Sequence, residues 1–322
     1  MMPDLRHSVE KETIRIGTLV NCNAPNPVKY IQQILPHGFE SFSLTFWETL
    51  GETNISRLAE NIQRVLEGTG VVISSLSVYG NPLESKEVNV ETLKSWNTLI
   101  ANAHLFDTDL VTGFTGRLRG KLLHESIPRF AEIFGPLAEK ARGKGVRLAF
   151  ENCSMDGTWY QGDWNIAHNP VAWDLMFEAL PYENLGLEWE PCHQLVALID
   201  PMPQLREWVS RIFHVHGKDA TIHWDVIKKY GIHSTVNEHI INAAHVKLAP
   251  QFAYHRTPGF GDSNWTDIIS ELRKGGFTGS IDIEGWHDPV YRDELEMTGQ
   301  VHALRYLKRC RGGEFVENPP SH

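Results

Sequence analysis

The chain has 322 residues, of which 41% are hydrophobic and 22% charged, a composition typical of a soluble globular protein with a large core. Its net charge of −10, without any block of like charges, argues against nucleic acid or an anionic membrane as the main partner, because both need a basic surface. A polar start at residues 1–13, no run of roughly 18 apolar residues, and only four cysteines predict a cytoplasmic protein with reduced thiols and no membrane span.

Eight short apolar runs, bounded by turn residues, have the pattern of buried parallel strands. They cover residues 15–20, 39–46, 71–78, 105–114, 147–152, 185–190, 212–217 and 280–285. Helical patterns lie between them at residues 54–67, 90–104, 127–142, 170–180, 203–210 and 265–274. Several of these helices end in glycine or basic residues immediately before the next strand, as helix C-termini do.

This alternation predicts an α/β fold of the (β/α)8 TIM-barrel type. We expect a single barrel domain over residues 1–322, with a core at about 15–308 and polar N- and C-terminal extensions. An open doubly wound sheet is the alternative. It is disfavoured because no GxGxxG or GxxxxGK[ST] motif follows the first strand, so nothing marks a nucleotide phosphate site.

Two long connections interrupt the alternation, one after the fifth strand at residues 153–169 and one after the seventh at residues 220–264. Both follow the C-terminal ends of strands, where the active sites of such barrels assemble. Long loops of this kind in compact domains are commonly functional. We therefore expect both to cover a site.

Four ionisable residues stand at or near the ends of predicted strands. They are Glu151 in RLAFEN, Glu190 in LGLEWEPCH, His216 in IFHVHGKD and Glu284 in SIDIEGWHD. Burying an ionisable group is costly unless it is paired or bound to a metal. Each residue alone is explained by a satisfied core or ion-pair position, but four at equivalent strand ends predict one site, which only barrel closure can assemble.

Three carboxylates and one imidazole make a hard, oxygen-rich ligand set. Such a set suits Mn²⁺, Mg²⁺ or Co²⁺ better than a closed cysteine-based zinc site. The sequence therefore predicts a divalent metal at the C-terminal end of the barrel.

The order of these motifs resembles the xylose-isomerase-like barrel superfamily, which includes sugar (phosphate) isomerases and epimerases, over about residues 15–308. The resemblance rests on Glu151, on Glu190 and His193 in EPCH, on His216, Lys218 and Asp219 in HGKD, and on Glu284. It implies that Glu151, Glu190, His216 and Glu284 hold the metal, with Mn²⁺ favoured. The second ligand of that family is usually Asp; with the longer Glu190, either the metal shifts or a water completes its shell.

The resemblance also implies an activity. The chain would be a metal-dependent carbohydrate enzyme that removes a proton next to a sugar carbonyl through a metal-stabilised enediolate, as sugar isomerases and epimerases do. Glu151 and Glu284 would act as base and acid as well as ligands. His193 would be a catalytic residue that hydrogen-bonds a substrate hydroxyl or carbonyl oxygen; the alternative is a helix-cap or surface histidine.

Further residues are expected to contact the substrate. Trp159 and Trp286 are predicted near the mouth of the barrel, where a flat ring can stack on a sugar or an aryl group; core packing is the alternative. Arg256, in the second long loop, is predicted to reach substrate oxygens as a forked donor.

Two charged pairs are expected to support the site. His287 is predicted to contact substrate and to form a proton-transfer pair with Asp288, because a carboxylate orients and charges an imidazole. Lys218 and Asp219 are predicted to form an ion pair that orients His216.

Three classes of function remain open. The first is a sugar isomerase or epimerase. The second is a lyase of the C-glycoside deglycosidase type, which cleaves a 3-keto-glycoside by β-elimination with a smaller β subunit. The third is a non-enzymatic sugar-binding barrel. In each case the partner is a small sugar or glycoside, with no nucleic acid and no membrane, and an oligomer is expected. An endonuclease is disfavoured because it would need more metal ligands and a basic groove.

Overall fold

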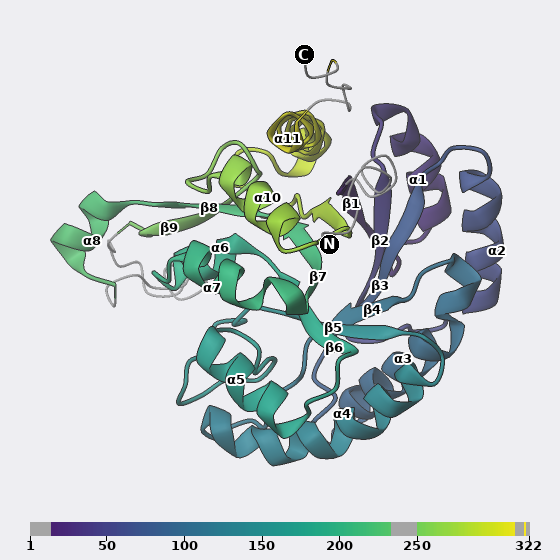
Figure 1. Ribbon diagram of the computed structural model, residues 1–322, viewed down its shortest axis with the longest axis horizontal. Helices are drawn as coiled ribbons and strands as arrows, with labels where there is room; N and C mark the ends of the chain where they lie inside the picture. Colours follow the sequence, from purple (N-terminus) through teal and green to yellow (C-terminus); the bar gives the residue numbers. More distant parts are fainter. Residues whose placement is uncertain (1–13, 233–249, 313–318, 320–322) are drawn as a thin grey trace.

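The computed structural model, which describes residues 14–232, 250–312 and 319, forms a closed barrel of eight parallel strands surrounded by helices (Figure 1). β10 pairs with both β7 and β1 and so closes the barrel. The barrel strands are β1 (Arg15–Asn21), β2 (Ser41–Trp47), β3 (Val72–Tyr79), β4 (Leu110–Gly113), β5 (Arg147–Glu151), β6 (Leu185–Trp189), β7 (Ile212–Gly217) and β10 (Ser280–Ile283). The predicted (β/α)8 barrel is confirmed.

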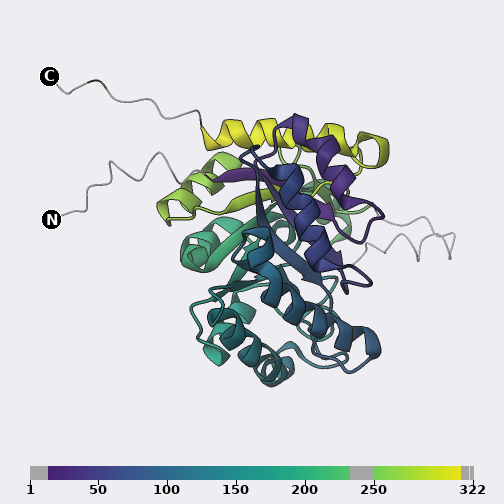
Figure 2. The ribbon, with the colours of Figure 1, turned by 90° about the vertical axis from the view of Figure 1, so that its right-hand side faces the viewer.

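Helices cover the outside of the barrel, and Figure 2 shows α11, in yellow, beside the purple first elements of the described chain, where it contacts β1. The helices are α1 (Pro27–Ile34), α2 (Ile55–Leu66), α3 (Glu87–Asn102), α4 (Ile127–Arg142), α5 (Pro170–Ala179), α6 (Pro191–Val196), α7 (Pro201–Trp208), α8 (Trp224–Tyr230), α10 (Trp265–Lys274) and α11 (Glu296–Arg311). The six predicted helices are present, with shifts at some ends of one to three residues.

Four of these helices were not predicted, namely α1, α6, α8 and α11. The sequence carries a start signal for α1: the side chain of Asn26 accepts a hydrogen bond from the backbone N–H of Lys29 at 3.0 Å, and Pro27 occupies the first turn. Helix α1 has only eight residues, so its apolar period is too short to stand out.

The fourth strand is shorter than predicted. It begins at Leu110, whereas residues 103–106 form a turn of 3₁₀ helix that continues α3. Phe106 in this turn is fully buried, so the apolar run that suggested a strand is the buried end of a helix. An apolar run of this length does not by itself distinguish the two.

The first long connection, residues 153–169, contains no regular helix or strand. Arg117, a fully buried arginine, binds this connection: its guanidinium donates to the backbone carbonyl oxygen of Trp159 at 3.1 Å and also to that of Thr158. The loop is thus held against the barrel.

The second long connection contains a two-stranded antiparallel sheet, β8 (Asp219–Ile222) with β9 (Ala253–Arg256), and helix α8. Together they form an arm that extends from the barrel in Figure 1. Residues 233–249 of the predicted loop lie outside the described residues.

The interior of the barrel contains an unusual number of polar side chains. Ser43 Oγ lies 2.7 Å from Ser75 Oγ and 3.1 Å from Ser77 Oγ, and Thr112 donates to Ser77 at 2.7 Å. Barrel interiors of this fold are normally filled by branched apolar residues. Here, hydroxyl groups satisfy one another inside the barrel.

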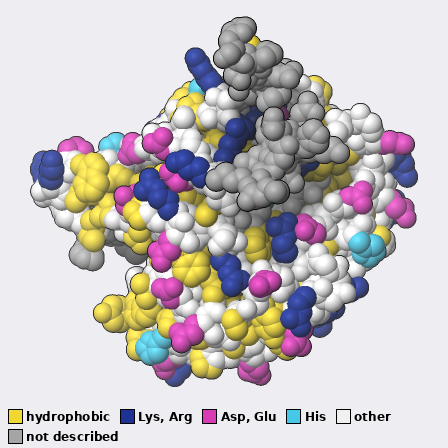
Figure 3. Space-filling model, in the orientation of Figure 1, with side chains coloured by type: hydrophobic (Ala, Val, Ile, Leu, Met, Phe, Trp, Pro, Cys, Tyr) yellow, Lys and Arg dark blue, Asp and Glu magenta, His cyan; other side chains and the backbone are white. Residues whose placement is uncertain are grey.

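Charges of both signs are interspersed on the face of the molecule in Figure 3, with Lys and Arg beside Asp and Glu. This distribution agrees with the sequence, which has no block of basic residues. Among the described residues, no helix is long and apolar enough to cross a membrane.

An aromatic cluster joins helices α3 and α4 to the barrel, and Phe134 lies at its centre. Its ring centroid lies 4.9 Å from that of Phe150 and 5.3 Å from that of Trp96, both in edge-to-face geometry. We expect Phe134→Ala to lower the free energy of unfolding by about 3–5 kcal/mol, because it leaves a cavity in a packed core. Urea unfolding of the metal-free protein measures the change. Val171→Ala, at a largely exposed position, should change it by less than about 0.5 kcal/mol; equal effects would contradict the prediction.

Candidate metal centre

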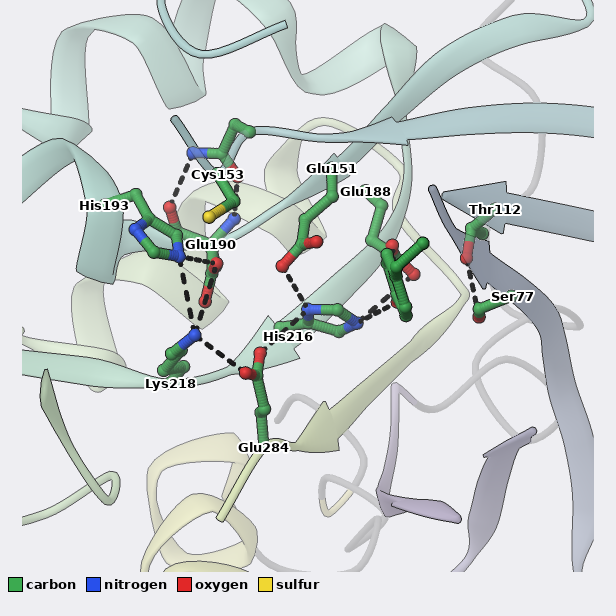
Figure 4. Close-up of polar contacts among 12 residues, drawn as sticks. Ser77, Thr112, Glu151, Cys153, Glu188, Glu190, His193, His216, Lys218 and Glu284 are labelled. Atoms are coloured by element: carbon green, nitrogen blue, oxygen red, sulfur yellow. Dashed lines mark hydrogen bonds and ion pairs between the residues drawn. The ribbon is translucent and has the colours of Figure 1, made fainter. Parts of the chain in front are cut away.

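Barrel closure brings the four predicted metal ligands to one place (Figure 4). Glu151 ends β5, Glu190 directly follows β6, His216 lies in β7, and Glu284 directly follows β10. Because the strands are parallel, these positions share the C-terminal rim. All four side chains are buried, and one ligand atom from each lies within 4.8 Å of the others. Their role as ligands stays a prediction.

The backbone at this rim is fixed by Asn152, which follows Glu151. Its side chain exchanges two hydrogen bonds with the backbone of Glu190, accepting from the N–H at 2.7 Å and donating to the carbonyl oxygen at 2.8 Å. This clamp sets the separation of the two glutamates at the ends of β5 and β6.

The carboxylate oxygens of the cluster are only partly satisfied. His216 Nδ1 lies 3.2 Å from Glu151 Oε1 and 3.3 Å from Glu284 Oε2. His193 Nε2 lies 2.8 Å from Glu190 Oε1, but within the described part of the chain both oxygens of Glu190 and Oε2 of Glu284 receive no well-aligned hydrogen bond. Buried acceptors without donors are costly. A divalent cation would compensate them, so this donor set fits Mn²⁺, Mg²⁺ or Co²⁺.

Burial and mutual repulsion act on two of these carboxyl groups. Burial, the largest cause, raises the pKa of Glu151 to about 7, and the charges of Glu190 and Glu284 add to the rise. Burial also raises the pKa of Glu190 to about 7, against the opposing effect of Lys218. Without a cation, both groups therefore bind protons around neutral pH.

Glu284 behaves in the opposite way. Burial acts to raise its pKa, but the Lys218 ammonium and hydrogen bonds from His216 and His287 outweigh it and hold the pKa well below its usual range. Lys218 Nζ lies 2.7 Å from Glu284 Oε1, and His287 Nε2 lies 2.9 Å from the same oxygen. Glu284 is thus a fixed anion, whereas Glu151 can exchange a proton.

One side of the centre is lined by basic side chains. Lys218 Nζ lies 3.4 Å from His193 Nε2 and 4.0 Å from Glu190 Oε1. The ring of His255, from β9, lies 5.1 Å from that of His193 and 5.6 Å from that of His287. Burial, and then the charge of Lys218, lower the pKa of His193 to about 3 and that of His255 to about 2, so both rings are neutral. Neutral imidazoles can both donate to and accept from sugar hydroxyls.

The predicted ion pair between Lys218 and Asp219 is wrong. Lys218 points into the centre, whereas Asp219 accepts from Trp265 Nε1 at 3.0 Å and from the backbone N–H of Ser263 at 3.1 Å. Successive residues of an extended chain point to opposite sides. Asp219 therefore ties β8 to the start of α10 and does not orient His216.

The predicted pair of His287 and Asp288 is also wrong. His287 bonds to Glu284, and Asp288 accepts from Arg256 Nε at 3.0 Å and from the backbone N–H of Thr257 at 2.9 Å. Arg256 and His255 are neighbours in β9, so their side chains leave opposite faces of the strand. Arg256 is thus paired with Asp288, and its predicted contact with substrate stays a prediction.

The tryptophans separate into three environments. Trp159 stacks on His124 and packs against the hydrophobic core. Trp286 is 39% exposed, with its ring 5.6 Å from that of His287, which itself contacts Glu284. Trp189 is fully buried and belongs to the core.

A further aromatic group, which we call the aromatic wall, lies on the other side of the centre. It consists of Trp47, Phe114 and Trp164. The ring of Trp47 lies 5.4 Å from that of Trp164 and 6.4 Å from that of Phe114. Phe114 in turn packs on Tyr79 at 5.1 Å, and the hydroxyl of Tyr79 lies 3.3 Å from His216 Nε2. The wall is therefore continuous with the metal centre.

Sequence analysis missed three buried residues beneath the cluster: Tyr79, Glu188 and His214. Glu188 Oε1 lies 2.8 Å from His214 Nδ1 and 3.2 Å from His216 Nε2, and Glu188 Oε2 accepts from Tyr79 at 3.0 Å. The motifs LEWE and HVH held the signal, because strand residues two apart face the same side. His255 was missed because nothing in the sequence predicted β9.

Fold and cluster together define a (β/α)8 barrel whose C-terminal rim carries a buried Glu/His set consistent with a divalent metal site. The family model described as xylose isomerase-like TIM barrel matches residues 31–310. The chain therefore belongs to this family. None of the curated proteins matches it in sequence.

Solved structures with the same fold include several sugar enzymes. The 3-keto-D-glucoside 4-epimerase of E. coli is 13% identical, with 92% of this chain and 100% of that chain covered and a TM-score of 0.65. A D-psicose 3-epimerase of Clostridium cellulolyticum H10 is 13% identical, with 92% and 99% covered and a TM-score of 0.63. A xylose isomerase domain protein of Alicyclobacillus acidocaldarius is 16% identical, with 92% and 98% covered and a TM-score of 0.65. At these identities the likeness shows the fold alone.

The affinity for Mn²⁺ is expected to rise with pH through about 7. Ligand carboxylates must be ionised, and a cation that binds below the raised pKa of Glu151 and Glu190 must displace their protons. Burial acts to lower the pKa of His216, but its carboxylate neighbours outweigh this effect and raise the pKa. The cation must therefore displace a proton from His216 as well, which also makes the affinity rise with pH. Calorimetric titration of the EDTA-treated protein between about pH 5.5 and 8.5 measures the trend. An affinity that is constant or falls over this range would contradict it.

Proposed function

We propose that this protein is a divalent-metal-dependent enzyme that moves a proton at a carbon next to a sugar carbonyl, as sugar isomerases and epimerases do. The observation that carries the proposal is the cluster of Glu151, Glu190, His216 and Glu284 at the rim of the barrel. Both carboxylate oxygens of Glu190 and one of Glu284 are buried and receive no well-aligned hydrogen bond from the described residues. Such oxygens are disfavoured in a merely structural role. The sugar epimerases among the solved structures of this fold support the same reaction class.

In this proposal, Glu151, Glu190, His216 and Glu284 hold the cation, with Mn²⁺ favoured. When bound, the cation supplies Lewis-acid polarisation of a carbonyl and a neighbouring hydroxyl oxygen. Glu190 is one methylene longer than the Asp usual at this position, and its carboxylate still lies within the cluster.

The chain's own groups then divide the proton transfer. Glu151 is the proton carrier, because its carboxylate contacts the ring of His216 and no lysine or arginine of the described residues, whereas Glu284 is bonded to the Lys218 ammonium. Glu284, whose Oε2 lies 3.3 Å from the same nitrogen of His216, holds an anionic position and contributes the second carboxylate. Lys218 and His193, 3.4 Å apart, are placed to donate to substrate oxygens. The rings of His255 and His287 extend this donor surface.

A second candidate, a lyase acting on aryl keto-glycosides, is favoured by the aromatic wall. Trp47 is 52% exposed at the end of β2, and its ring is linked to the centre through Phe114 and Tyr79. A flat aglycone could stack on it while the sugar faces the basic side. In that reaction the proton leaves the carbon beside the keto group, and the electron pair expels the aglycone. A smaller β subunit and a neighbouring sugar oxidoreductase would accompany this function.

Glu151→Gln should reduce turnover of a keto-sugar by about 10²–10⁴-fold even with saturating Mn²⁺, because it removes the proton carrier. A screen of free ketohexoses and aryl 3-keto-glycosides, with loss of activity on EDTA treatment, identifies the substrate first. Glu67→Gln, an exposed carboxylate after α2, is the control and should retain full activity. Wild-type turnover in Glu151→Gln would disprove its role, and sugar binding without any turnover would favour a non-enzymatic barrel.

Trp47→Ala distinguishes the two candidate substrates. Aromatic stacking contributes about 0.5–1.5 kcal/mol, so kcat/KM for an aryl keto-glycoside should fall roughly 2- to 10-fold while that for a free ketohexose stays unchanged. Trp224→Ala, a similarly exposed tryptophan on α8, is the matched control and should change neither. An equal loss for both substrates would argue against an aglycone on the wall.

A further inference from the structure

A chain of buried acidic and imidazole side chains runs inside the barrel beneath the metal centre. It begins at His216 and continues through Glu188 to His214. His214 Nε2 then lies 2.7 Å from Asp282 Oδ2. Asp282 in turn accepts from Ser41 at 2.5 Å and also from Ser74, so the chain ends in hydroxyl groups.

The two ring nitrogens of His216 face different environments. Nδ1 points to the carboxylates of Glu151 and Glu284, which with Glu190 form the proposed ligand set. Nε2 points the other way, to Glu188 Oε1 at 3.2 Å and to the hydroxyl of Tyr79 at 3.3 Å. An imidazole that binds a cation through one nitrogen carries its proton on the other, and a carboxylate at that second nitrogen fixes both the tautomer and the ring orientation.

Glu188 is itself held rigidly. Its Oε1 is shared between His214 Nδ1 at 2.8 Å and His216 Nε2, and its Oε2 accepts from Tyr79 at 3.0 Å. Both nitrogens of His214 are engaged by carboxylates. Both oxygens of Glu188 thus have hydrogen-bond partners. In contrast, the oxygens of Glu190, two residues later on the same face, receive no well-aligned hydrogen bond from the described residues.

We propose that Glu188 is a positioning residue: it holds the Nε2 proton of His216, so that Nδ1 is presented to the cation, and His214 and Asp282 hold Glu188 in place. This inference rests on the metal dependence of the proposed function. The competing arrangement, a second cation held by Glu188, His214 and His216, would require the hydrogen bonds of Glu188 and His214 to be given up.

A comparison of Mn²⁺ binding tests the proposal. The wild-type chain, freed of metal with EDTA and titrated calorimetrically at one pH, should bind one Mn²⁺. Glu188→Gln keeps the shape but removes the charge, and should weaken binding about 10- to 100-fold, the usual effect of losing such a partner. Tyr79→Phe removes the hydroxyl that contacts both Glu188 Oε2 and His216 Nε2 but leaves the carboxylate of Glu188 in place, so it should weaken binding less. This variant keeps the test valid if Glu188→Gln does not fold.

A second measurement does not depend on affinity. In the wild-type protein loaded with diamagnetic Mg²⁺, ¹⁵N NMR of the histidine rings should show the proton of His216 on Nε2, and Glu188→Gln should lose this single tautomer. The control is Glu40→Gln. Glu40 is a half-buried carboxylate that bonds to Arg311 and to the backbone N–H of Ile16, so its loss should lower the Tm without changing Mn²⁺ affinity.

The outcomes separate the two claims. Equal Mn²⁺ affinity in wild type and Glu188→Gln would overturn the positioning role and leave the proposed function intact. Two Mn²⁺ per wild-type chain, one of them lost in Glu188→Gln, would make Glu188 a ligand and also overturn it. No Mn²⁺ or Mg²⁺ binding by the wild type would overturn the metal-dependent function itself.

Discussion

The structure depends on how like charges are buried together at one end of the barrel. Closure of the sheet brings Glu151, Glu190 and Glu284 within contact distance in a place largely excluded from water. Each carboxylate disfavours the charge of the others, and burial disfavours all three. Lys218 compensates mainly Glu284. The remaining negative charge is shared by Glu151 and Glu190, and either protons or a cation that contacts both carboxylates can neutralise it.

That constraint explains why the two sides of the mouth differ. One side of the cluster is lined by nitrogen atoms, from His193 on α6, Lys218 directly after β7, His255 on β9 and His287 in the turn after β10. On the other side, the aromatic wall presents ring surfaces and few polar atoms. The proposed substrate is thereby oriented, with oxygen atoms toward the nitrogens and any apolar part toward the rings.

The sequence predicted the barrel and the position of the cluster because both follow from strand periodicity and strand ends. Glu151, Glu190 and Glu284 each come at the end of an apolar run, and parallel strands bring such ends to one rim. It did not predict His255, because β9 is a short strand whose partner β8 is distant in sequence. It misassigned the partners of Lys218 and His287, since adjacency in sequence suggested Asp219 and Asp288. Extended backbone sends Lys218 and Asp219 to opposite sides. His287 lies in a turn and contacts Glu284, three residues earlier.

The pleat of the strands also places a second layer of polar side chains beneath the metal centre. Residues two apart on a strand face the same side about 7 Å apart along it, so Glu188 lies below Glu190 and His214 below His216. The carboxylate oxygens of Glu190 receive no well-aligned hydrogen bond from the described residues, whereas Glu188 and His214 bond to one another and His214 bonds to Asp282. A fully apolar second layer would leave the Nε2 side of His216 without an acceptor, and the ring free to turn its other nitrogen to the centre. The polar interior of this barrel is therefore the support on which the geometry of its rim depends.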